Sequence, residues 1–538
     1  MKKTHLPFRL LSLWLALTLP WGFAAPAGAA AGGLARVNIL ADGLTPEVRP
    51  HVGVDCMEQV LQRLVAEDTY PIQGSTCQTN SSGKLPLEEP WIHATGSIVE
   101  VGDNIATWNV CGFSPAILDP NAPQNLEELQ AADPKEVAQL SKFDGRNYGI
   151  ITPVRDQGSS NLCWAYASVN ASEASILREG IDPSATLDTL RFSPTHLGYI
   201  RFNRGPDLLG NTAGEEDPTA DWLQASGSPG YSSTLFSQWW GPVQDGTPMV
   251  NTPSVIEEHS GYRMEHAIEL DGQRLSSNPA ARTRMKEAIA QYGAVTFSYN
   301  WIHEVPYDNP SRGGFGNPHA CTIIGWDDTI PASLFSGGAS QDGGWLVKNS
   351  YSSLPYFYLS YDNNSSYVFA FDYATKEEYD FNYFYDSSVD DFGMAASLNY
   401  TCAANVFQGL KGSDSQTEYV KAVQVGFYGS GATCDVKVYT NLQDQQDMSD
   451  LANVDPTLGT LAASGSATFD RPGYHTVPLE QLAEVAPGSY FSIVVQISGS
   501  SPYLRVIRAA DCKSYVLSKY GAWQKSGLNV PRLKAYTV

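Results

Sequence analysis

Apolar and polar residues follow different patterns along the chain, and each pattern predicts a different kind of element. Residues 48–66 carry apolar side chains at helical spacing and predict an amphipathic helix, whereas residues 91–110 are typical of strands. Within an acidic connector at residues 121–140, Asp133 and Pro134 signal the start of a further helix. These patterns predict a mixed N-terminal region that ends in a connector.

From about residue 367 onward, short apolar runs separated by turn residues predict an all-β region. Apolar residues alternate at 423–427 and 436–438, and further runs lie at 474–479, 490–497 and 503–509. Short strands at such close spacing favour an antiparallel sandwich or barrel.

The first residues have the layout of a secretory signal peptide. Three basic residues precede an apolar run from Leu10 to Phe23, and small residues at 25–31 offer cleavage sites. The run is short and is broken by Pro20, which argues against a transmembrane anchor. The sequence therefore predicts that residues 1–31 direct export and that the protein is secreted without a membrane anchor.

Composition and charge narrow the classes of partner. The 538 residues include 34 Lys+Arg against 57 Asp+Glu, which gives a formal net charge of −23. So acidic a chain argues against binding to nucleic acid or to an anionic membrane surface, because both need a basic face. With 42% hydrophobic residues the chain can build folded cores, and its many Gly, Pro and Tyr residues favour β-rich, loop-rich domains.

The eight cysteines do not define a metal site or a disulfide framework. They form three groups, at 56–111, at 163 and 321, and at 402–512, and export would permit disulfides whose connectivity the spacing leaves open. His319 and Cys321 are spaced so that they could share a metal only with further ligands. We therefore expect neither metal nor cofactor.

Three separated segments carry residue types that suit nucleophilic catalysis. A loop containing Pro and Gly leads directly into Cys163, which opens a predicted helix near 163–179. A helix N-terminus stabilises a thiolate through its dipole and unpaired N–H groups, so we expect a lowered pKa for this thiol. His319 begins an apolar strand-like run, and Asn349 ends another. Thiol, imidazole and amide can serve as nucleophile, base and orienting group.

These segments resemble the papain-like cysteine peptidase family, in which a Gln precedes a helix-opening Cys-Trp-Ala, His-Ala precedes a hydrophobic strand, and Lys-Asn-Ser follows. The resemblance extends over about residues 141–365. It implies that Cys163 is the nucleophile, His319 the base and Asn349 the residue that orients the base. It also implies that Gln157 supplies the oxyanion-hole side chain.

The chain departs from the family pattern at several positions. Ser-Asn-Leu at 160–162 replaces the usual Cys-Gly-Ser, so the disulfide made by that Cys is absent. Tyr351 stands where the family has a Trp that shields the Asn–His hydrogen bond, and its smaller ring predicts weaker shielding. Residues 225–242 loosely match the family's Gly-rich substrate-binding segment, with Gly227 and Gly230 as candidates there or as ordinary turn glycines.

The predicted fold class is α+β: a papain-like two-lobed domain, with a helical lobe and a β-barrel-like lobe, followed by an all-β sandwich. Residues 196–242 and the β-rich tail resemble a bacterial and archaeal branch of the family with a C-terminal lectin-like domain. The predicted units are a signal peptide at 1–31, a propeptide or accessory region at 32–140, the peptidase domain at 141–365 and the lectin-like domain at 366–538.

The function predicted from these residues is a secreted cysteine endopeptidase that cleaves proteins or peptides through a thioester acyl-enzyme. The resemblance implies carbohydrate as a further partner, bound by the C-terminal domain. Two alternatives stay open. The papain-like domain could be catalytically weak, leaving a surface- or carbohydrate-binding protein, or the same triad could serve transpeptidation or peptidoglycan amidase chemistry.

Overall fold

The fold was analysed in a computed structural model, which describes residues 98–101, 105–108, 119, 121–215, 218–301, 305–310, 317–386, 401–409, 417–500, 502–509 and 512–538. The predicted signal peptide and the predicted helix at 48–66 lie outside these residues. Strands β1 (Ile98–Val101) and β2 (Ile105–Trp108) form an antiparallel pair, which confirms the strands predicted within residues 91–110. Helix α6 (Pro134–Val137) begins after its N-cap Asp133, as predicted.

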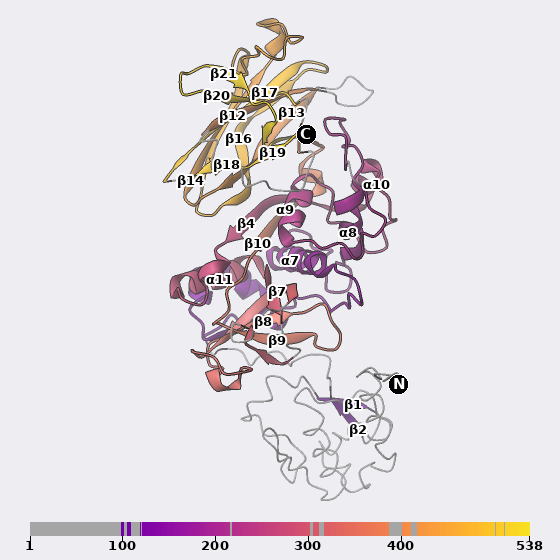
Figure 1. The fold of residues 1–538 in the computed structure, drawn as a ribbon, viewed down its shortest axis with the longest axis vertical. Helices are drawn as coiled ribbons and strands as arrows, with labels where there is room; N and C mark the ends of the chain where they lie inside the picture. The colour runs from indigo at the N-terminus through magenta and orange to yellow at the C-terminus, as the bar shows by residue number, and fades with distance from the viewer. Residues whose placement is uncertain are drawn as a thin grey trace, which may run out of the picture.

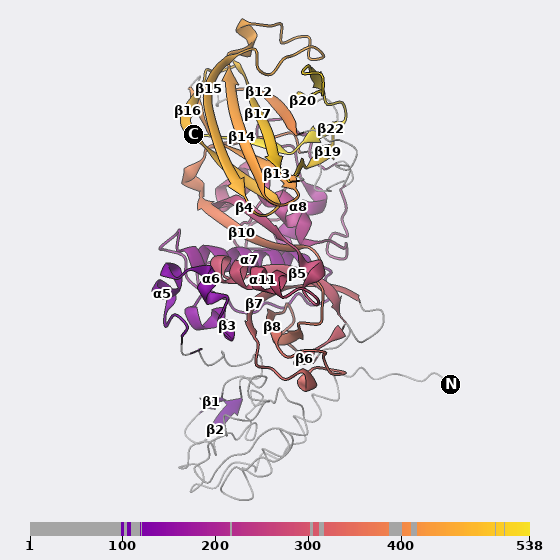
Figure 2. The same cartoon turned by 90° about the vertical axis from the view of Figure 1, so that its left-hand side faces the viewer.

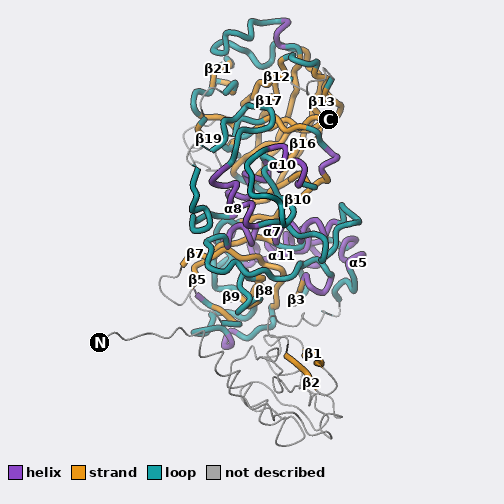
Figure 3. The backbone as a smooth tube through the Cα atoms, turned by 90° about the vertical axis from the view of Figure 1, so that its right-hand side faces the viewer, coloured by secondary structure: helices purple, strands orange, loops and turns teal. Residues whose placement is uncertain are grey.

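The described part is elongated, with a helical region between two β-rich ends (Figures 1 and 3). The helices are α5 (Leu126–Ala131), α6, α7 (Cys163–Glu179), α8 (Pro194–Asn203), α9 (Pro229–Ser237), α10 (Pro253–His259) and α11 (Pro279–Tyr292). Helix α7 confirms the predicted helix and ends at Gly180, whose φ of 68° is in the left-handed region that glycine tolerates. Almost every α7 residue is buried, because its small side chains let neighbouring elements approach closely.

One sheet lies against α7 and carries most of the candidate chemistry. Its order is β3-β7-β8-β9-β6, with β5 also paired to β7. The strands are β3 (Lys142–Asp144), β5 (Val295–Trp301), β6 (Tyr307–Asp308), β7 (Asn317–Asp327), β8 (Gly344–Lys348) and β9 (Tyr356–Ser360). Since β7 runs antiparallel to β8, the start of β7 and the end of β8 lie at the same edge of the sheet.

The C-terminal region is a sandwich of two antiparallel sheets, seen at the top of Figure 2. One sheet contains β11 (Phe381–Tyr383), β13 (Glu418–Tyr428), β16 (Gly473–Val485), β18 (Tyr503–Leu504) and β23 (Leu533–Thr537). The other contains β12 (Cys402–Gln408), β14 (Ala432–Thr440), β15 (Thr460–Phe469), β17 (Tyr490–Gly499), β20 (Ser514–Leu517) and β21 (Trp523–Lys525). The strands predicted from sequence are confirmed, although the run at 503–509 divides into β18 and β19 (Val506–Arg508), of which β19 pairs with β22 (Asn529–Pro531).

The first sheet of the sandwich continues into the preceding unit. Strand β4 (Tyr262–Leu270) pairs on one side with β10 (Val368–Thr375) and on the other with β16, so strands from both units form one sheet. The side chains of β10 belong to the first hydrophobic core, although the sequence analysis placed residues from 366 onward in the sandwich. Residues up to Tyr373 form the first core and residues from Tyr383 the second, except that Tyr474 of β16 packs in the first core. The domain limits drawn from the sequence stay predictions.

The β4–β16 contact, which we call the junction, depends on a glycine and encloses two imidazoles. Gly473 has a φ of 140°, and a Cβ there would lie 1.8 Å from the carbonyl oxygen of Ala267. His266 and His475 are paired across the junction, with ring centroids 5.4 Å apart. Phe469 stacks on His475 at 4.4 Å. Burial lowers the pKa of His266 to about 4 and that of His475 to about 3, the latter also through repulsion between the two imidazoles.

The described cysteines are all free thiols, namely Cys163, Cys321, Cys402, Cys434 and Cys512. The remaining three cysteines lie outside the described residues. Within the ranges that the structure describes, no helix is both long enough and apolar enough to span a bilayer.

Candidate active site

Cys163 is the first residue of α7, where no side chain caps the helix. The backbone N–H groups of Ala320, Trp164 and Cys163 itself point toward the thiol and lower its pKa, as expected for a helix N-terminus. Burial is the larger effect, however, and raises the pKa of Cys163 above its ordinary value. The expectation of a lowered pKa from the helix alone was therefore wrong, because it left out desolvation.

His319 and Asn349 form the central contact of the site. His319 lies near the start of β7 and Asn349 directly follows β8, so the antiparallel pairing brings them to one edge of the sheet. The His319 Nε2 and Asn349 Oδ1 atoms are 2.9 Å apart. Asn349 Nδ2 donates to the carbonyl of Leu354 at 3.0 Å, and its Oδ1 accepts from the N–H of Ser350 at 2.8 Å. These contacts fix the amide orientation, so Nε2 of His319 must be the donor and Nδ1 is left as the base.

Gln157 is joined to the same edge through Ser350. The backbone N–H of Gln157 donates to the carbonyl of Ser350 at 2.8 Å, and the Ser350 hydroxyl donates to Gln157 Oε1 at 2.5 Å. Gln157 Nε2 donates one hydrogen to the carbonyl of Ser160 at 2.6 Å. An amide nitrogen carries two hydrogens, so a second donor remains on Gln157. Hydrogen bonds thus link His319 to Asn349 and, through Ser350, to Gln157, while the Cys163 thiol lies beside the N–H of Ala320, the residue after His319.

Two aromatic rings cover His319. Tyr351 stacks on the imidazole with centroids 5.5 Å apart and planes 23° apart. Trp301, at the end of β5, lies 5.2 Å from the imidazole and 5.7 Å from Tyr351. The sequence analysis named Tyr351 but missed Trp301, because an aromatic residue in a strand is usually explained by core packing. The pairing of β5 with β7 would have revealed it, because Trp301 lies opposite Asn317, two residues before His319.

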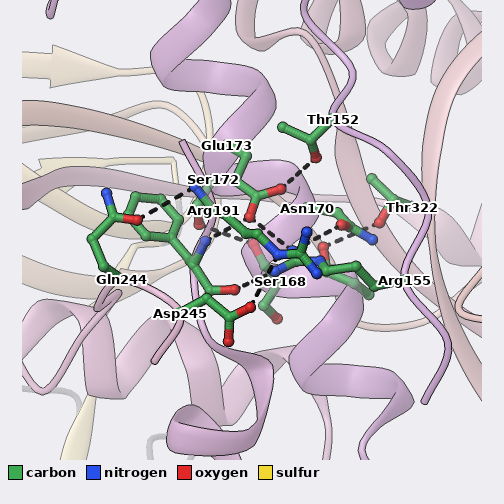
Figure 4. Close-up of polar contacts among 12 residues, drawn as sticks. Thr152, Arg155, Ser168, Asn170, Ser172, Glu173, Arg191, Gln244, Asp245 and Thr322 are labelled. Carbon is green, nitrogen blue, oxygen red and sulfur yellow. Dashed lines mark hydrogen bonds and ion pairs between the residues drawn. The ribbon is translucent and has the colours of Figure 1, made fainter. Parts of the chain in front are cut away.

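A buried polar network connects the loop before Gln157, helix α7 and strand β8, and Figure 4 shows its contacts between the loop and α7. Arg155, two residues before Gln157, forms an ion pair with Glu173 of α7 at 2.7 Å. Lys348, the residue before Asn349, donates to Thr152 Oγ1 at 3.0 Å and to Asn170 Oδ1 at 2.9 Å. Burial lowers the pKa of Lys348 to about 7, while Glu173 opposes that change. The network fixes the Gln157 loop, α7 and β8 relative to one another.

The two glycine candidates differ in what surrounds them. A Cβ on Gly227 would lie 2.4 Å from the indole of Trp164, the residue after Cys163, so only glycine permits this close approach. Gly230 lies in the first turn of α9, and a Cβ there would make an ordinary contact of 3.6 Å with Tyr367. Their role in substrate binding stays a prediction.

Cys321 is a second thiol at the site that the sequence analysis considered only as a metal ligand. It follows His319 by two residues on β7, is buried, and lies with its Sγ 3.5 Å from Asn349 Oδ1. Burial raises its pKa well above the ordinary value, so this thiol stays protonated and can donate to the amide oxygen. Among the residues that the structure describes, no three or more His, Cys, Asp or Glu side chains are grouped so that they could hold a metal ion.

Comparison with known proteins shows what the chain resembles. Residues 384–536 match the family described as a lectin like domain. The cysteine protease Cwp84, solved after propeptide cleavage, aligns with a TM-score of 0.55 and 20% identity, over 74% of this chain and 98% of that one. A structure of the cysteine protease and lectin-like domains of Cwp84, a surface layer associated protein of Clostridium difficile, gives 0.55 and 19%, over 74% and 88%.

Two animal proteins match part of the chain in sequence. Digestive cysteine proteinase 2 of Homarus americanus is 22% identical over 241 residues, which are 44% of this chain and 66% of that protein. Cathepsin L1 of Drosophila melanogaster is 22% identical over 234 residues, 43% of this chain and 55% of that protein. The chain thus spans just under two thirds of the one and about half of the other.

The chain therefore has the fold of a papain-like cysteine peptidase followed by a lectin-like domain. The predicted fold class, an α+β two-lobed unit and a β-sandwich, is confirmed.

Proposed function

We propose that this protein is an exported cysteine endopeptidase that hydrolyses peptide bonds in proteins or peptides. The observation that carries the proposal is the hydrogen bond between His319 and Asn349, which leaves a basic imidazole nitrogen at the strand edge against which Cys163 packs. The similar proteins include digestive cysteine proteinase 2 of Homarus americanus and the cysteine protease Cwp84, whose names support the same chemistry.

In the proposed mechanism, the Cys163 thiol gives its proton to Nδ1 of His319, and the resulting thiolate attacks the substrate carbonyl. The N–H of Cys163 and the second hydrogen on Gln157 Nε2 hold the developing oxyanion, and such a donor is worth about 3 kcal/mol. The imidazolium then protonates the leaving amine, and a thioester remains on Cys163. Water, deprotonated by His319, hydrolyses the thioester. Asn349 keeps the imidazole oriented throughout.

Replacement of the nucleophile tests the proposal. Cys163→Ala is expected to abolish hydrolysis of casein while the circular dichroism spectrum stays that of the wild type. Cys434→Ala removes a buried thiol of the sandwich core and is the matched control, which is expected to keep activity. Wild-type chain that leaves casein intact but cleaves cell-wall fragments would favour the amidase alternative. Failure to react with an epoxide thiol inhibitor would favour a binding protein.

We also propose that residues 1–31 direct export and that residues 32–140 include a propeptide, with an accessory region as the alternative. Cwp84 supports both points, since it is described as surface layer associated and was solved after propeptide cleavage. N-terminal sequencing of the secreted active form tests this, because a start near residue 141 is expected for a propeptide and a start near residue 30 for a permanent domain. Carbohydrate binding by residues 384–536 stays a prediction of the lectin-like fold.

A further inference from the structure

The imidazole of His319 is covered by Trp301 and Tyr351, which we call the aromatic cover. The three ring centroids form a triangle with sides of 5.2, 5.5 and 5.7 Å, and the planes are inclined by 18° to 35°. Rings on opposite faces of the imidazole would lie about 7 Å apart, twice the contact distance of stacked carbon atoms. Since Trp301 and Tyr351 are closer than that, both lie toward the same face of His319.

The two rings come from separate parts of the chain. Trp301 ends β5, whereas Tyr351 follows Ser350 after β8. Both are only partly buried, while His319 beneath them is 4% exposed. The cover therefore separates the imidazole and its hydrogen bond to Asn349 from water.

Charge separation at this site faces an energetic obstacle. Burial lowers the pKa of His319 and raises that of Cys163, so each group alone prefers to be neutral. Among the described residues, the titratable groups that face His319 are Cys163 from α7, Cys321 from its own strand, Tyr299 from β5 and Tyr351 after β8. None of these side chains is an anion that would stabilise an imidazolium before the thiol ionises, and Asn349 contributes only a neutral oxygen.

The faces of aromatic rings attract cations within about 6 Å of the ring centroid, and the attraction grows where water is excluded. Both rings of the cover are within that distance of His319. We propose that Trp301 is a positioning residue that, with Tyr351, holds His319 in place and stabilises its imidazolium form. This inference rests on the proposed function, in which His319 must carry the proton of Cys163.

The cover has a distinct signature in a pH profile. Loss of imidazolium stabilisation lowers the pH at which His319 gives up its proton beside the thiolate. The acid limb reports ionisation of the Cys163 thiol. His319 is protonated both before and after that ionisation, so the acid limb is unchanged. We therefore expect the alkaline limb alone to move, by roughly half to one pH unit. A ring that only fills space would change the rate and leave both limbs in place.

The test compares Trp301→Phe with Trp301→Leu in the full chain, because these variants are similar in size and differ in aromaticity. The rate of Cys163 alkylation by iodoacetamide is measured against pH, with mass spectrometry to locate the label, and casein hydrolysis is measured in parallel. Trp523→Ala in the sandwich is the control for loss of an indole elsewhere. If Trp301→Leu does not fold, Tyr351→Phe and Tyr351→Leu provide the same comparison.

The expected result is an alkaline transition that falls in the Leu variant and is largely kept in the Phe variant. Equal shifts in both variants, or no shift in either, would overturn the inference. The alkylation profile needs no peptide substrate, so it tests the aromatic cover separately from the proposed peptidase activity. If the Leu variant shows the shift while the wild-type chain leaves casein intact, the proposed peptidase activity is refuted and the aromatic cover is not.

Discussion

Because His266 and His475 lie at the junction with lowered pKa values, we expect acid to weaken the contact between the two units. His475 is enclosed by Phe427, Phe469 and His266, with ring centroids 5.2, 4.4 and 5.4 Å away. Its Nε2 and the Nδ1 of His266 are buried atoms without a hydrogen-bond partner. His475 is buried and His266 half-buried, so a proton on either imidazole places a charge where water is largely excluded.

The direction in which pH changes the free energy of unfolding follows from how many protons the folded and unfolded states bind. Below pH 6.5 the unfolded chain protonates both histidines, whereas the folded chain does so only at about pH 4 for His266 and about pH 3 for His475. Unfolding therefore takes up protons in this window, and the free energy of unfolding falls as the pH falls. Between pH 6.5 and pH 4.5 the loss from each histidine is roughly 2 kcal/mol, because the full slope of about 1.4 kcal/mol per pH unit is reached only once the unfolded imidazole is fully protonated.

Other groups titrate in the same pH range and change the stability in the opposite direction. Burial raises the pKa of Asp372, which is paired with His266 across β10 and β4, to about 7, and that carboxyl gains stability as the pH falls. A comparison between the wild type and a variant removes this contribution, because Asp372 is present in both.

The assay is urea unfolding of the full chain at pH 7 and at pH 4.5, for the wild type and for His475→Phe. Phenylalanine suits the aromatic surroundings and does not titrate, so the variant is expected to lose roughly 2 kcal/mol less between the two pH values. His259→Phe removes an imidazole outside the junction and accounts for any general effect of losing a histidine. An equal pH dependence in wild type and His475→Phe would refute the reasoning.

Two further predictions concern contacts on which the fold and the site depend. Gly473→Ala is expected to destabilise the chain by at least about 2 kcal/mol in urea unfolding, because its Cβ would overlap the carbonyl of Ala267. Gly488→Ala, also at positive φ but with open space around it, is the control and should cost about 1 kcal/mol. Lys348→Met is expected to lower kcat/KM on casein at least about tenfold, with two buried acceptors left without their donor. Unchanged activity in that variant would contradict the positioning role of the network.

The candidate catalytic residues were accessible from sequence because each lies in a short segment whose local pattern is informative. A small-residue helix closed by Gly180 places Cys163 at its start, and apolar strand patterns place His319 and Asn349 at strand ends. Their convergence required only that the two strands be antiparallel neighbours. The alternating pattern likewise predicted the strands of the sandwich.

What the sequence did not provide are contacts between distant segments. Alternation shows which side chains of a strand are buried but not which strand lies beside it, so the pairing of β4 with β16 and the inclusion of β10 in the first core were missed. Trp301 was missed for the same reason. The raised pKa of Cys163 was missed because local sequence reveals the helix end and not the depth of burial around it.

The two buried histidine contacts of this protein show why similar burial has different chemical consequences. At the junction, His266 and His475 are both bases, so no proton can pass between them to create opposite charges, and burial keeps both neutral. In the proposed site the partners are an acid and a base. Transfer of one proton from Cys163 to His319 creates two opposite charges whose attraction offsets the cost of burying each. The same desolvation therefore makes one pair a structural contact sensitive to acid and prepares the other for nucleophilic attack.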